Sequence, residues 1–332
     1  MKAMQLRNFA PVEQNPLRLV NLPVPEPGPT DVLLRVKTCA VCHTDLHTVE
    51  GELSQVKLPV IPGHEIIGVV EKRGERVTRF KKGERVGVAW LYSACGKCNF
   101  CRRGNENLCE NARFTGFHAN GGYAEYIVVP EKFAYAIPRA FSDEEAAPLL
   151  CAGIIGYRAL RLSEIRPGQK LGIYGFGASA HVAIQVARYW GCKVYVFSRK
   201  EEHRILASKL GAIWTGKASD EPPEKMNSSI IFAPAGELVL EALRVLEKGG
   251  TVALAGIYMT PIPEMDYVKY LYHERTLRSV ANATRKDGEE FLKIAARIPI
   301  KTTTELFMLE GANKVLQLLK AGRINGAAVL KL

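Results

Sequence analysis

The chain has no apolar run long enough to cross a membrane. Among its 332 residues, no stretch approaches the ~20 consecutive apolar residues that a membrane helix needs. The opening segment, Met1–Arg7, lacks the apolar core of a secretory signal. Internal repeats and low-complexity tracts are also absent. These absences predict a folded cytoplasmic protein with no membrane partner.

Motifs of nucleic-acid binding are missing as well. The 45 basic and 34 acidic residues give a net charge of +11, which permits nucleic acid, anionic membranes or phosphate-rich ligands as partners. The basic residues are spread along the chain, however, and neither an aromatic-basic RNA motif nor a recognition-helix pattern occurs. We therefore expect no nucleic-acid partner.

Cysteine is too sparse for a disulfide scaffold. The chain holds eight cysteines, and four of them fall between positions 95 and 109. Disulfide scaffolds are short chains with a far higher cysteine content. Because no export signal is present, this clustering favours metal ligation over disulfide bonds.

The local patterns divide the chain into regions. Residues 1–140 are rich in Val, Gly and Pro, with short apolar runs, which indicates a β-rich region. From about Ser142, strand and helix patterns alternate. The expected strands cover 171–174, 193–197, 229–232, 251–255 and 277–280, and the expected helices cover 180–190, 201–210 and 237–246. Strands joined by crossover helices imply a parallel, doubly wound sheet in an α/β protein. Beyond about Lys286 two helical stretches and a final strand at 327–330 are expected.

Four cysteines share one loop with the spacing C-x2-C-x2-C-x7-C. They are Cys95, Cys98, Cys101 and Cys109. Four thiolates this close can surround one zinc and leave no open position, so the site is predicted to be structural. An iron-sulfur cluster also takes four thiolates, although its usual spacings differ. A free-standing zinc ribbon that binds nucleic acid is another interpretation of the four cysteines, but this loop sits inside a larger domain.

A second set of possible metal ligands is scattered along the chain. It comprises Cys42 in the run Cys-His-Thr-Asp, His64 and Glu65 in the run Gly-His-Glu, and Cys151 in the run Cys-Ala-Gly. Three protein ligands with one open position are the pattern of a catalytic zinc. A lone buried cysteine is usually core packing, and we interpret Cys39 and Cys192 in that way.

A glycine-rich turn follows the expected strand at 171–174 and opens the next helix. It reads Gly175-Phe176-Gly177-Ala178-Ser179-Ala180, which is the context of a dinucleotide-binding turn. The next strand ends at Ser198-Arg199-Lys200, where an NAD enzyme normally presents an acidic residue to the ribose. A hydroxyl and two cations favour a 2′-phosphate and therefore NADP. If Arg199 only stacks on adenine and Lys200 is only solvated, the enzyme accepts both cofactors or prefers NAD.

Taken together, these motifs resemble those of the zinc-containing alcohol dehydrogenases of the medium-chain dehydrogenase/reductase superfamily. The resemblance covers essentially the whole chain and includes the run Gly-Gly-Tyr-Ala-Glu-Tyr at 121–126. It implies a GroES-like catalytic domain with the zinc lobe at 1–149, a Rossmann cofactor domain at 150–285, and a return to the catalytic domain at 286–332. It also implies a homodimer or homotetramer, built partly by edge strands of the cofactor domain.

The resemblance assigns roles to the scattered ligands. Cys42, His64 and Cys151 would hold a catalytic zinc, with Glu65 as an occasional ligand and Asp45 accepting the ring N–H of His64. Two zinc ions per chain are therefore expected, one catalytic and one structural. Zinc would lower the pKa of an alcohol so that hydride can leave for the nicotinamide. Thr44 and His47 would carry the released proton outward, whereas the alternative for His47 is a plain surface histidine.

The resemblance also implies contacts to cofactor and substrate. The expected cofactor contacts are His43, Gly175, Gly177, Ala178, Ser179, Ser198, Arg199, Lys200, Ala233, Gly256, Ile257 and Ala281. Trp90 and Thr44 would line a narrow pocket for a primary alcohol or aldehyde, with Tyr92, Ile257 and Val280 as further candidates. The alternative for Trp90 is core packing. An arginine that the family often keeps near the last strand is replaced by Gly326-Ala327-Ala328, which leaves the pyrophosphate to His43 or Arg323.

Three other functions were weighed against this interpretation. A zinc-independent quinone or enone reductase of the same superfamily would not keep the catalytic ligands. A polyol dehydrogenase shares zinc and fold but usually lacks the full proton-relay motif. A non-catalytic zinc-ribbon binding protein would explain the lobe and the net charge, yet neither the glycine-rich turn nor the scattered ligands.

Overall fold

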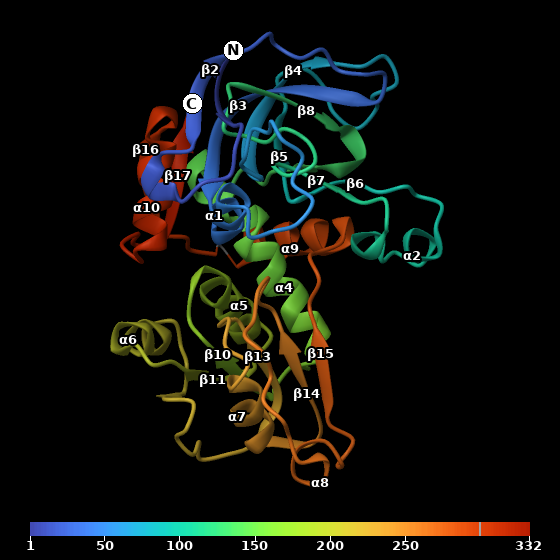
Figure 1. Ribbon diagram of the computed structural model, residues 1–332. Helices are drawn as coiled ribbons and strands as arrows, with labels where there is room; N and C mark the ends of the chain where they lie inside the picture. Colours follow the sequence, from blue (N-terminus) through green and yellow to red (C-terminus); the bar gives the residue numbers. More distant parts are fainter. Residues whose placement is uncertain (299) are drawn as a thin grey trace. The chain divides into compact units, whose positions relative to one another are not determined.

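The computed structural model describes residues 1–298 and 300–332, which form two compact units. The first unit comprises Met1–Cys151, Thr284–Ala296 and Lys301–Leu332. The second comprises Ala152–Ala283 and a short piece around residue 298. Figure 1 shows the elements of both units. Within the described residues, no helix combines the length and the apolar character that crossing a bilayer requires.

The first unit is built on a seven-stranded sheet in the order β16-β17-β3-β4-β5-β9, with β8 also paired to β3. Its strands are β3 (Asp31–Val41), β4 (Glu65–Arg73), β5 (Arg85–Val88), β8 (Tyr126–Pro130), β9 (Ala134–Ala136), β16 (Thr304–Met308) and β17 (Ala327–Lys331). Two small sheets pair β1 (Lys2–Leu6) with β2 (Leu17–Asn21) and β6 (Leu91–Ser93) with β7 (Arg113–Phe114). The pair β16–β17 is parallel, and the other pairs of this unit are antiparallel.

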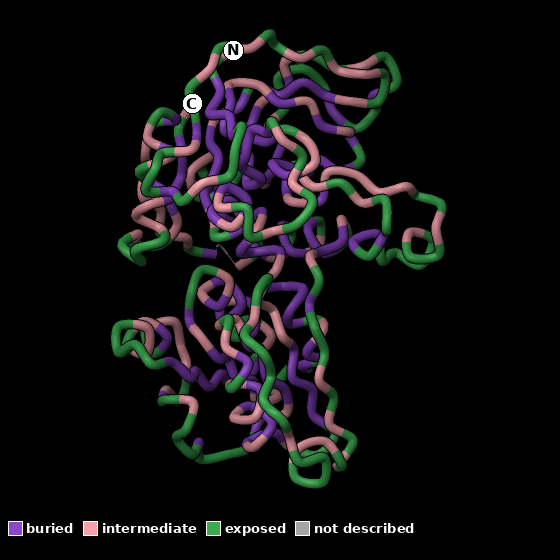
Figure 2. The backbone as a smooth tube through the Cα atoms, in the orientation of Figure 1, coloured by how far each residue is buried: buried purple, intermediate pink, exposed green. Residues whose placement is uncertain are grey.

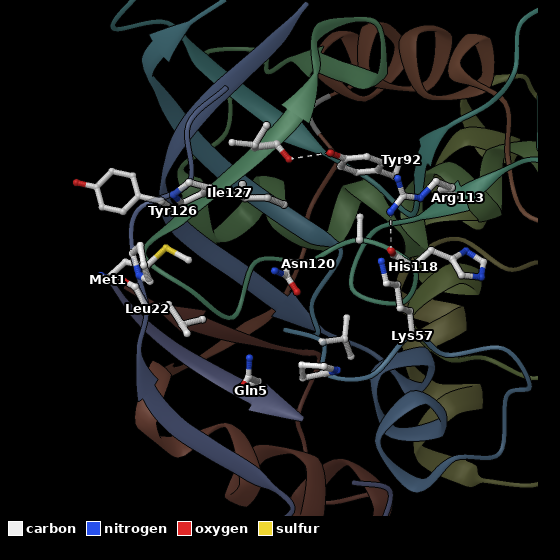
Figure 3. Close-up of a pocket in the computed structure, with 16 residues that line it drawn as sticks. Met1, Gln5, Leu22, Lys57, Tyr92, Arg113, His118, Asn120, Tyr126 and Ile127 are labelled. Carbon is white, nitrogen blue, oxygen red and sulfur yellow. Dashed lines mark hydrogen bonds between the residues drawn. The ribbon is translucent and has the colours of Figure 1, made fainter. Parts of the chain in front are cut away.

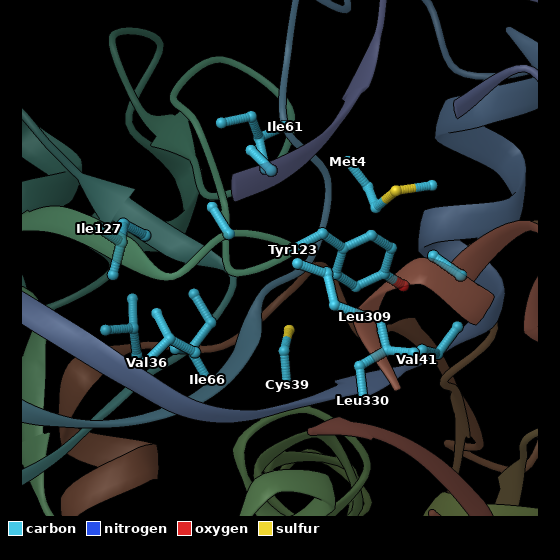
Figure 4. Close-up of a cluster of buried hydrophobic side chains, with 14 of the residues drawn as sticks. Met4, Val36, Cys39, Val41, Ile61, Ile66, Tyr123, Ile127, Leu309 and Leu330 are labelled. Carbon is cyan, nitrogen blue, oxygen red and sulfur yellow. The ribbon is translucent and has the colours of Figure 1, made fainter. Parts of the chain in front are cut away.

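Strand β3 is the centre of the first unit because it pairs with β4, β8 and β17. It is buried along most of its length, as its run of Val, Leu, Cys and Ala predicts for a strand covered on both faces. Figure 4 shows Cys39 of this strand with Ile66 and Tyr123 in the hydrophobic core. Cys39 is therefore core packing, as expected, and Cys192 is also buried. Figure 2 shows buried residues concentrated on the sheet strands.

Short helices connect the strands of the first unit. They are η1 (Val12–Gln14), α1 (His43–Glu50), α2 (Asn99–Arg102), η2 (Glu106–Leu108), η3 (Glu131–Phe133), α3 (Asp143–Ala146), η4 (Ala147–Leu150), α9 (Arg285–Arg297), η5 (Leu309–Gly311) and α10 (Ala312–Lys320). Helix α10 contributes Ala312, Val315 and Leu316 to the same core as β3.

The second unit is a six-stranded parallel sheet in the order β12-β11-β10-β13-β14-β15. Its strands are β10 (Lys170–Tyr174), β11 (Lys193–Phe197), β12 (Trp214–Gly216), β13 (Met226–Ile231), β14 (Leu246–Leu254) and β15 (Thr276–Ser279). Its helices are α4 (Ala152–Leu162), α5 (Ala178–Tyr189), α6 (Glu201–Lys209), α7 (Leu238–Arg244) and α8 (Tyr267–Tyr270). The chain leaves β10 in one direction across the sheet and returns on its other side at β13, so the strand order reverses at β10.

The structure corrects the expected elements in four places. The short strands β12 and β16 were not foreseen, because three to five residues carry little periodic signal. Helix α7 ends at Arg244 rather than 246, and β14 begins at Leu246 rather than 251. The reason is that Leu246 already pairs with Met226 of β13, ahead of Gly249 and Gly250.

Candidate functional site

Cys42 stands at the N-cap of α1, where its side chain is fixed by the backbone. Its Sγ accepts a hydrogen bond from the Thr44 N–H at 3.3 Å. The Asp45 carboxylate reaches back and accepts from the Cys42 N–H at 3.0 Å, which completes a capping box. A sulfur in this place also receives the favourable field of the helix N-terminus. The run Cys-His-Thr-Asp therefore folds locally in a way that holds the Cys42 sulfur for a ligand.

Asp45 connects Cys42 to the second ligand segment. Its Oδ1 accepts the Gly63 N–H at 3.0 Å and lies 3.3 Å from Nδ1 of His64. Asp45 is 2% exposed and His64 is 1% exposed in their side chains. The carboxylate thus faces one ring nitrogen of His64 while the other, Nε2, points to the Cys42 sulfur at 3.3 Å. This is the arrangement that orients a metal-ligating histidine.

Gly63 is required immediately before His64. Its backbone has φ of +96°, and a Cβ at this position would lie 2.4 Å from the Tyr123 ring and 2.8 Å from the Cys39 sulfur. Only glycine fits both the backbone conformation and the space. The core around Tyr123 therefore fixes the point at which His64 and Glu65 enter the site.

Four donor side chains meet at one place in the first unit. One ligand atom each from Cys42, His64, Glu65 and Cys151 lies within 4.8 Å of the others. His64 and Glu65 are buried at the start of β4, and Cys151 follows η4. Two sulfurs, an imidazole nitrogen and a carboxylate oxygen form a donor set that suits zinc.

The electrostatics of this cluster fit a bound cation. A hydrogen bond with Cys151 and burial raise the pKa of the Cys42 thiol well above its ordinary value. Burial and the nearby Cys42 likewise raise the pKa of the Glu65 carboxyl. Burial disfavours the imidazolium of His64, but the charges of Cys42 and Asp45 outweigh burial and raise its pKa. These buried groups cannot all be ionised together unless a cation compensates their charge.

Thr44 and His47 lie one turn apart on α1, next to the donor cluster. Thr44 is buried, and His47 is half-buried. The Nδ1 atom of His47 contacts the Glu52 carboxylate, which the sequence analysis did not foresee. Gly51 caps the helix in a left-handed conformation, and the Glu52 N–H then donates to the His47 carbonyl at 3.0 Å. A glycine at the end of α1 was the available signal that residue 52 returns to the helix.

Trp90 packs directly against a ligand residue. Its ring meets the His64 ring edge-on with centroids 4.9 Å apart. Phe114 stacks on Trp90 at 5.2 Å with an interplanar angle of 11°, and Phe117 contacts it at 5.5 Å. The orientation of Trp90 is therefore set by two phenylalanines that the sequence analysis did not single out.

The four-cysteine lobe forms a second donor cluster. One sulfur each from Cys95, Cys98, Cys101 and Cys109 lies within 4.8 Å of the others. Backbone N–H groups of Lys97 and Cys98 lower the pKa of the Cys95 thiol to about 6. Desolvation and the neighbouring Cys98 raise that of Cys101 to about 12. An all-sulfur set of this kind matches a closed structural zinc site.

A buried ion pair ties the lobe to α9. The Glu106 carboxylate, 7% exposed, accepts from the Arg285 backbone N–H at 3.1 Å and from its Nε at 2.9 Å. The Arg285 guanidinium also lies over the Phe133 ring at 4.8 Å. Glu106 thus holds the lobe against a helix that lies 179 residues further along the chain.

The second unit gathers its expected cofactor residues at one edge of the sheet. Gly175 follows β10, Ser198 follows β11, and Ala233, Gly256 and Ala281 follow β13, β14 and β15. Because the carboxyl ends of parallel strands share one edge, these positions line the same side of the sheet. Ile257 is 56% exposed beside Gly256.

The glycine-rich turn has the backbone that a dinucleotide needs. Gly175 has φ of +82°, and a Cβ there would lie 2.9 Å from Ala233. Gly177 is the N-cap of α5, with nothing within 4 Å of the place where a Cβ would be. Ala178 and Ser179 form the first turn of α5, so their N–H groups face the open turn.

Ser198 directly follows β11 and lies among basic residues. Its Oγ lies 3.4 Å from His203 Nδ1, and its carbonyl accepts from Arg204 Nη1 at 2.8 Å. Arg199 and Lys200 are exposed. His203 and Arg204 were not predicted, although both lie in the first turns of α6.

Comparison with known families matches both units. Residues 28–139 match the alcohol dehydrogenase GroES-like domain, and residues 180–297 match the zinc-binding dehydrogenase family. A Mycobacterium tuberculosis protein named probable alcohol dehydrogenase AdhA is 48% identical over 99% of this chain and 97% of its own length. This chain belongs to the zinc-containing alcohol dehydrogenases of the medium-chain dehydrogenase/reductase superfamily.

Further relatives agree with this family. An alcohol dehydrogenase from Geobacillus stearothermophilus is 38% identical over 100% of the chain and 99% of its own length. The crystal structure of CAD from Helicobacter pylori in complex with NADP(H) superposes with a TM-score of 0.86 at 25% identity, covering 100% of this chain and 99% of that one. The chain is thus an NAD(P)-dependent alcohol dehydrogenase, and the predicted α/β fold with GroES-like and Rossmann domains is confirmed.

Within this alcohol dehydrogenase, four further predicted positions can be described by their local surroundings. Tyr92 donates to the Val128 carbonyl at 3.3 Å and lines a separate hollow. His43 is exposed at the first position of α1, and Arg323 is exposed beyond α10. Val280 is 9% exposed, directly after β15.

Proposed function

We propose that this alcohol dehydrogenase uses one zinc at Cys42, His64 and Cys151 and a second zinc in the lobe. The observation that carries the proposal is the meeting of four donor atoms within 4.8 Å in each of the two clusters. In the first cluster, Glu65 would be a ligand that exchanges with water. A bound zinc there supplies a Lewis acid that lowers the pKa of the substrate hydroxyl.

The residues around this cluster hold its ligands and move a proton. Asp45 fixes the ring of His64 through Nδ1, so that Nε2 is presented to the metal. The Thr44 hydroxyl would accept the proton of the alcohol, and His47 would pass it towards water. The Glu52 carboxylate contacts Nδ1 of His47 and would stabilise the imidazolium that forms.

We propose that reversible hydride transfer joins a primary alcohol and its aldehyde to a nicotinamide dinucleotide. The turn from Gly175 to Ser179 would cradle the pyrophosphate at the N-terminus of α5. His43, Ala233, Gly256, Ile257 and Ala281 would contact the remainder of the cofactor. Thr44 and Trp90 would narrow the pocket so that small primary alcohols fit.

We further propose that NADP is preferred and that NAD is also accepted. No acidic residue occupies positions 198–200 at the end of β11, and two cations stand there. A 2′-phosphate would meet the Ser198 hydroxyl, Arg199 and Lys200. The NADP(H) complex of the Helicobacter pylori relative is consistent with this preference.

Assembly and location complete the proposal. A homodimer or homotetramer would use the exposed edge strand β15, which ends the six-stranded sheet. None of the eight cysteines forms a disulfide, and six of them lie in the two proposed zinc sites, which would suit a reducing cytoplasm.

A substrate panel with both cofactors tests the catalytic proposal. The expected result is a higher kcat/KM for primary alcohols than for matched secondary alcohols, with NADP ahead of NAD. A kcat/KM with NAD equal to or above that with NADP would refute the cofactor preference. Equal rates with secondary alcohols would refute the narrow pocket.

A further inference from the structure

A hollow in the first unit lies apart from the donor clusters. Its volume is about 540 Å³, within the range of ~300–1,000 Å³ common for small-molecule sites. None of the residues that line it belongs to either metal cluster, and neither Thr44 nor Trp90 is among them; Tyr92, expected as a further substrate contact, lines this hollow instead. Figure 3 shows the side chains around this hollow.

The two ends of the hollow differ in chemistry. Met1, Leu22 and Ile127 lie towards one end, and Lys57, Arg113 and His118 lie towards the other (Figure 3). The apolar lining is extended by Pro23, Pro25, Pro59, Val60 and Val128. The hollow therefore offers mainly apolar surface at one end, where the Met1 ammonium donates to the Leu22 carbonyl, and cationic side chains at the other.

The positive end lacks balancing carboxylates. Within residues 1–298 and 300–332, neither Lys57 nor Arg113 has a carboxylate within 4.0 Å, and no Asp or Glu lines the hollow. Glu110 lines an adjoining hollow that shares Lys57, Arg113 and His118. Burial and the nearby Arg113 also lower the pKa of His118, as a surplus of positive charge requires.

Arg113 is held in place without a carboxylate partner within the described residues. Its Nη2 donates to the His118 carbonyl at 2.9 Å, and its guanidinium lies over the Tyr92 ring at 5.8 Å. A neutral carbonyl and an aromatic face orient the guanidinium and stabilise it in part, but neither supplies the negative charge that would neutralise it. Tyr92 is fixed in turn by its hydrogen bond to the Val128 carbonyl. This pre-organisation favours binding of an anion.

We propose that this hollow binds an anion with an apolar tail, such as a medium-chain carboxylate or an alkyl phosphate. The head group is bound by Lys57 and Arg113 with His118 beside them, and the tail lies along Leu22, Ile127 and the prolines. This site is separate from alcohol oxidation and does not depend on the catalytic assignment.

Calorimetric titration of the zinc-loaded enzyme tests the proposal. Decanoate and decyl phosphate carry a tail and an anionic head, acetate carries only the head, and decyltrimethylammonium carries the same tail with the opposite charge. We expect the two tailed anions to bind at one site per chain, and the tighter of them identifies the head group. Acetate and the cation are expected to bind at least tenfold more weakly, because each lacks one half of the complementarity.

Two variants locate the binding. The double variant K57Q/R113Q should raise the Kd of the tighter-binding anion by tenfold or more, since two charged contacts are lost. K57Q alone, which removes no side-chain hydrogen bond or ion pair found among the described residues, should raise this Kd by a smaller factor. The matched control K132Q/R139Q removes one exposed lysine and one exposed arginine elsewhere in the same unit and should bind as the parent does. Alcohol oxidation should be unchanged in all three.

Three results would overturn the proposal. The first is the absence of binding by either tailed anion at millimolar concentration. The second is equal affinity in K57Q/R113Q and its control, which would place the anion elsewhere, including the alcohol site. The third is equal binding of the cationic surfactant, which would reduce the hollow to a non-specific apolar patch.

Discussion

The first unit holds two donor clusters that are built on different plans. The cluster of Cys42, His64, Glu65 and Cys151 mixes sulfur, nitrogen and oxygen donors, and two of its members are buried. Its residues come from the start of α1, the start of β4 and the end of η4. The lobe offers four sulfurs from a single loop, and only one of the four cysteines is buried.

This difference fits the two roles that we propose, a catalytic zinc site in the mixed cluster and a structural zinc site in the lobe. A zinc in the lobe would be surrounded by four thiolates, with no position left for substrate. In the proposed catalytic site, two sulfurs and one imidazole would leave the fourth position to Glu65, water or substrate. The surroundings differ in the same sense. Asp45, Thr44 and Trp90 orient and enclose the mixed cluster. An ion pair ties the lobe to α9.

The largest effect should come from removing one sulfur in each cluster. Cys42→Ala should lower kcat/KM by about 10³-fold or more, because the metal's Lewis acidity contributes several kcal/mol. Cys98→Ala should lower thermal stability and spare most of the activity per folded molecule. Metal analysis should find one zinc lost in each variant. Comparable activity loss in both would erase the distinction between the clusters.

Replacing the carboxylate beside each cluster, Asp45 or Glu106, should likewise affect activity at the mixed cluster and stability at the lobe. Asp45→Asn should lower metal affinity at the mixed cluster, or activity, by about 10–100-fold, because His64 loses its orienting charge. Glu106→Gln should instead destabilise the lobe by about 1–2 kcal/mol, since the amide can still accept a hydrogen bond from Arg285 but carries no charge to pair with it. Zinc titration followed by kinetics measures the first, and thermal unfolding measures the second. A larger activity loss in E106Q than in D45N would contradict this account.

Only the mixed cluster needs a route for protons. His47→Gln should lower kcat about tenfold, mainly at low pH, because the amide cannot take up the proton. Glu52→Gln should have a smaller effect, since His47 keeps its ring and loses only a carboxylate. The pH dependence of kcat in both variants provides the measurement. A pH-rate profile identical to that of the parent in H47Q would exclude His47 from proton transfer.

A small effect is expected from the aromatic packing behind the mixed cluster. Phe114→Leu removes the ring stacked on Trp90 and should change the ratio of kcat/KM between short and long alcohols by about 3–10-fold, because pocket contacts of this size contribute ~1 kcal/mol. Phe114→Tyr should restore the parent ratio. Phe100→Leu changes an exposed phenylalanine of the lobe and is the matched control. A ratio that shifts equally in both leucine variants would show only a general loosening.

The two clusters also differ in how far the sequence predicts them. The lobe's cysteines lie within one loop, so their spacing alone indicated a four-sulfur site. The mixed cluster draws on positions 42, 64, 65 and 151, and only resemblance to a known family joined them. The capping box at Cys42 and Asp45 was readable locally, although its meaning depends on His64, which is brought near by the core around Gly63.

Contacts between side chains that are far apart in the sequence could not be predicted from local sequence patterns. The pairing of Glu106 with Arg285 and the stacking of Phe114 on Trp90 arise from tertiary packing, which no periodic pattern encodes. The alternation of strands and helices in the second unit was readable because strands such as β10 and β11 are short, largely apolar runs followed by helical periodicity. Strand β12 was missed because its three residues carry no pattern.

The most direct test is a crystal structure of the zinc-loaded enzyme with anomalous diffraction recorded on both sides of the zinc absorption edge. The account predicts two zinc peaks per chain. One should lie ~2.0–2.3 Å from Cys42 Sγ, His64 Nε2 and Cys151 Sγ, and the other should lie at similar range from the four lobe sulfurs. A fully metallated, active crystal with no zinc peak among Cys42, His64 and Cys151 would contradict it.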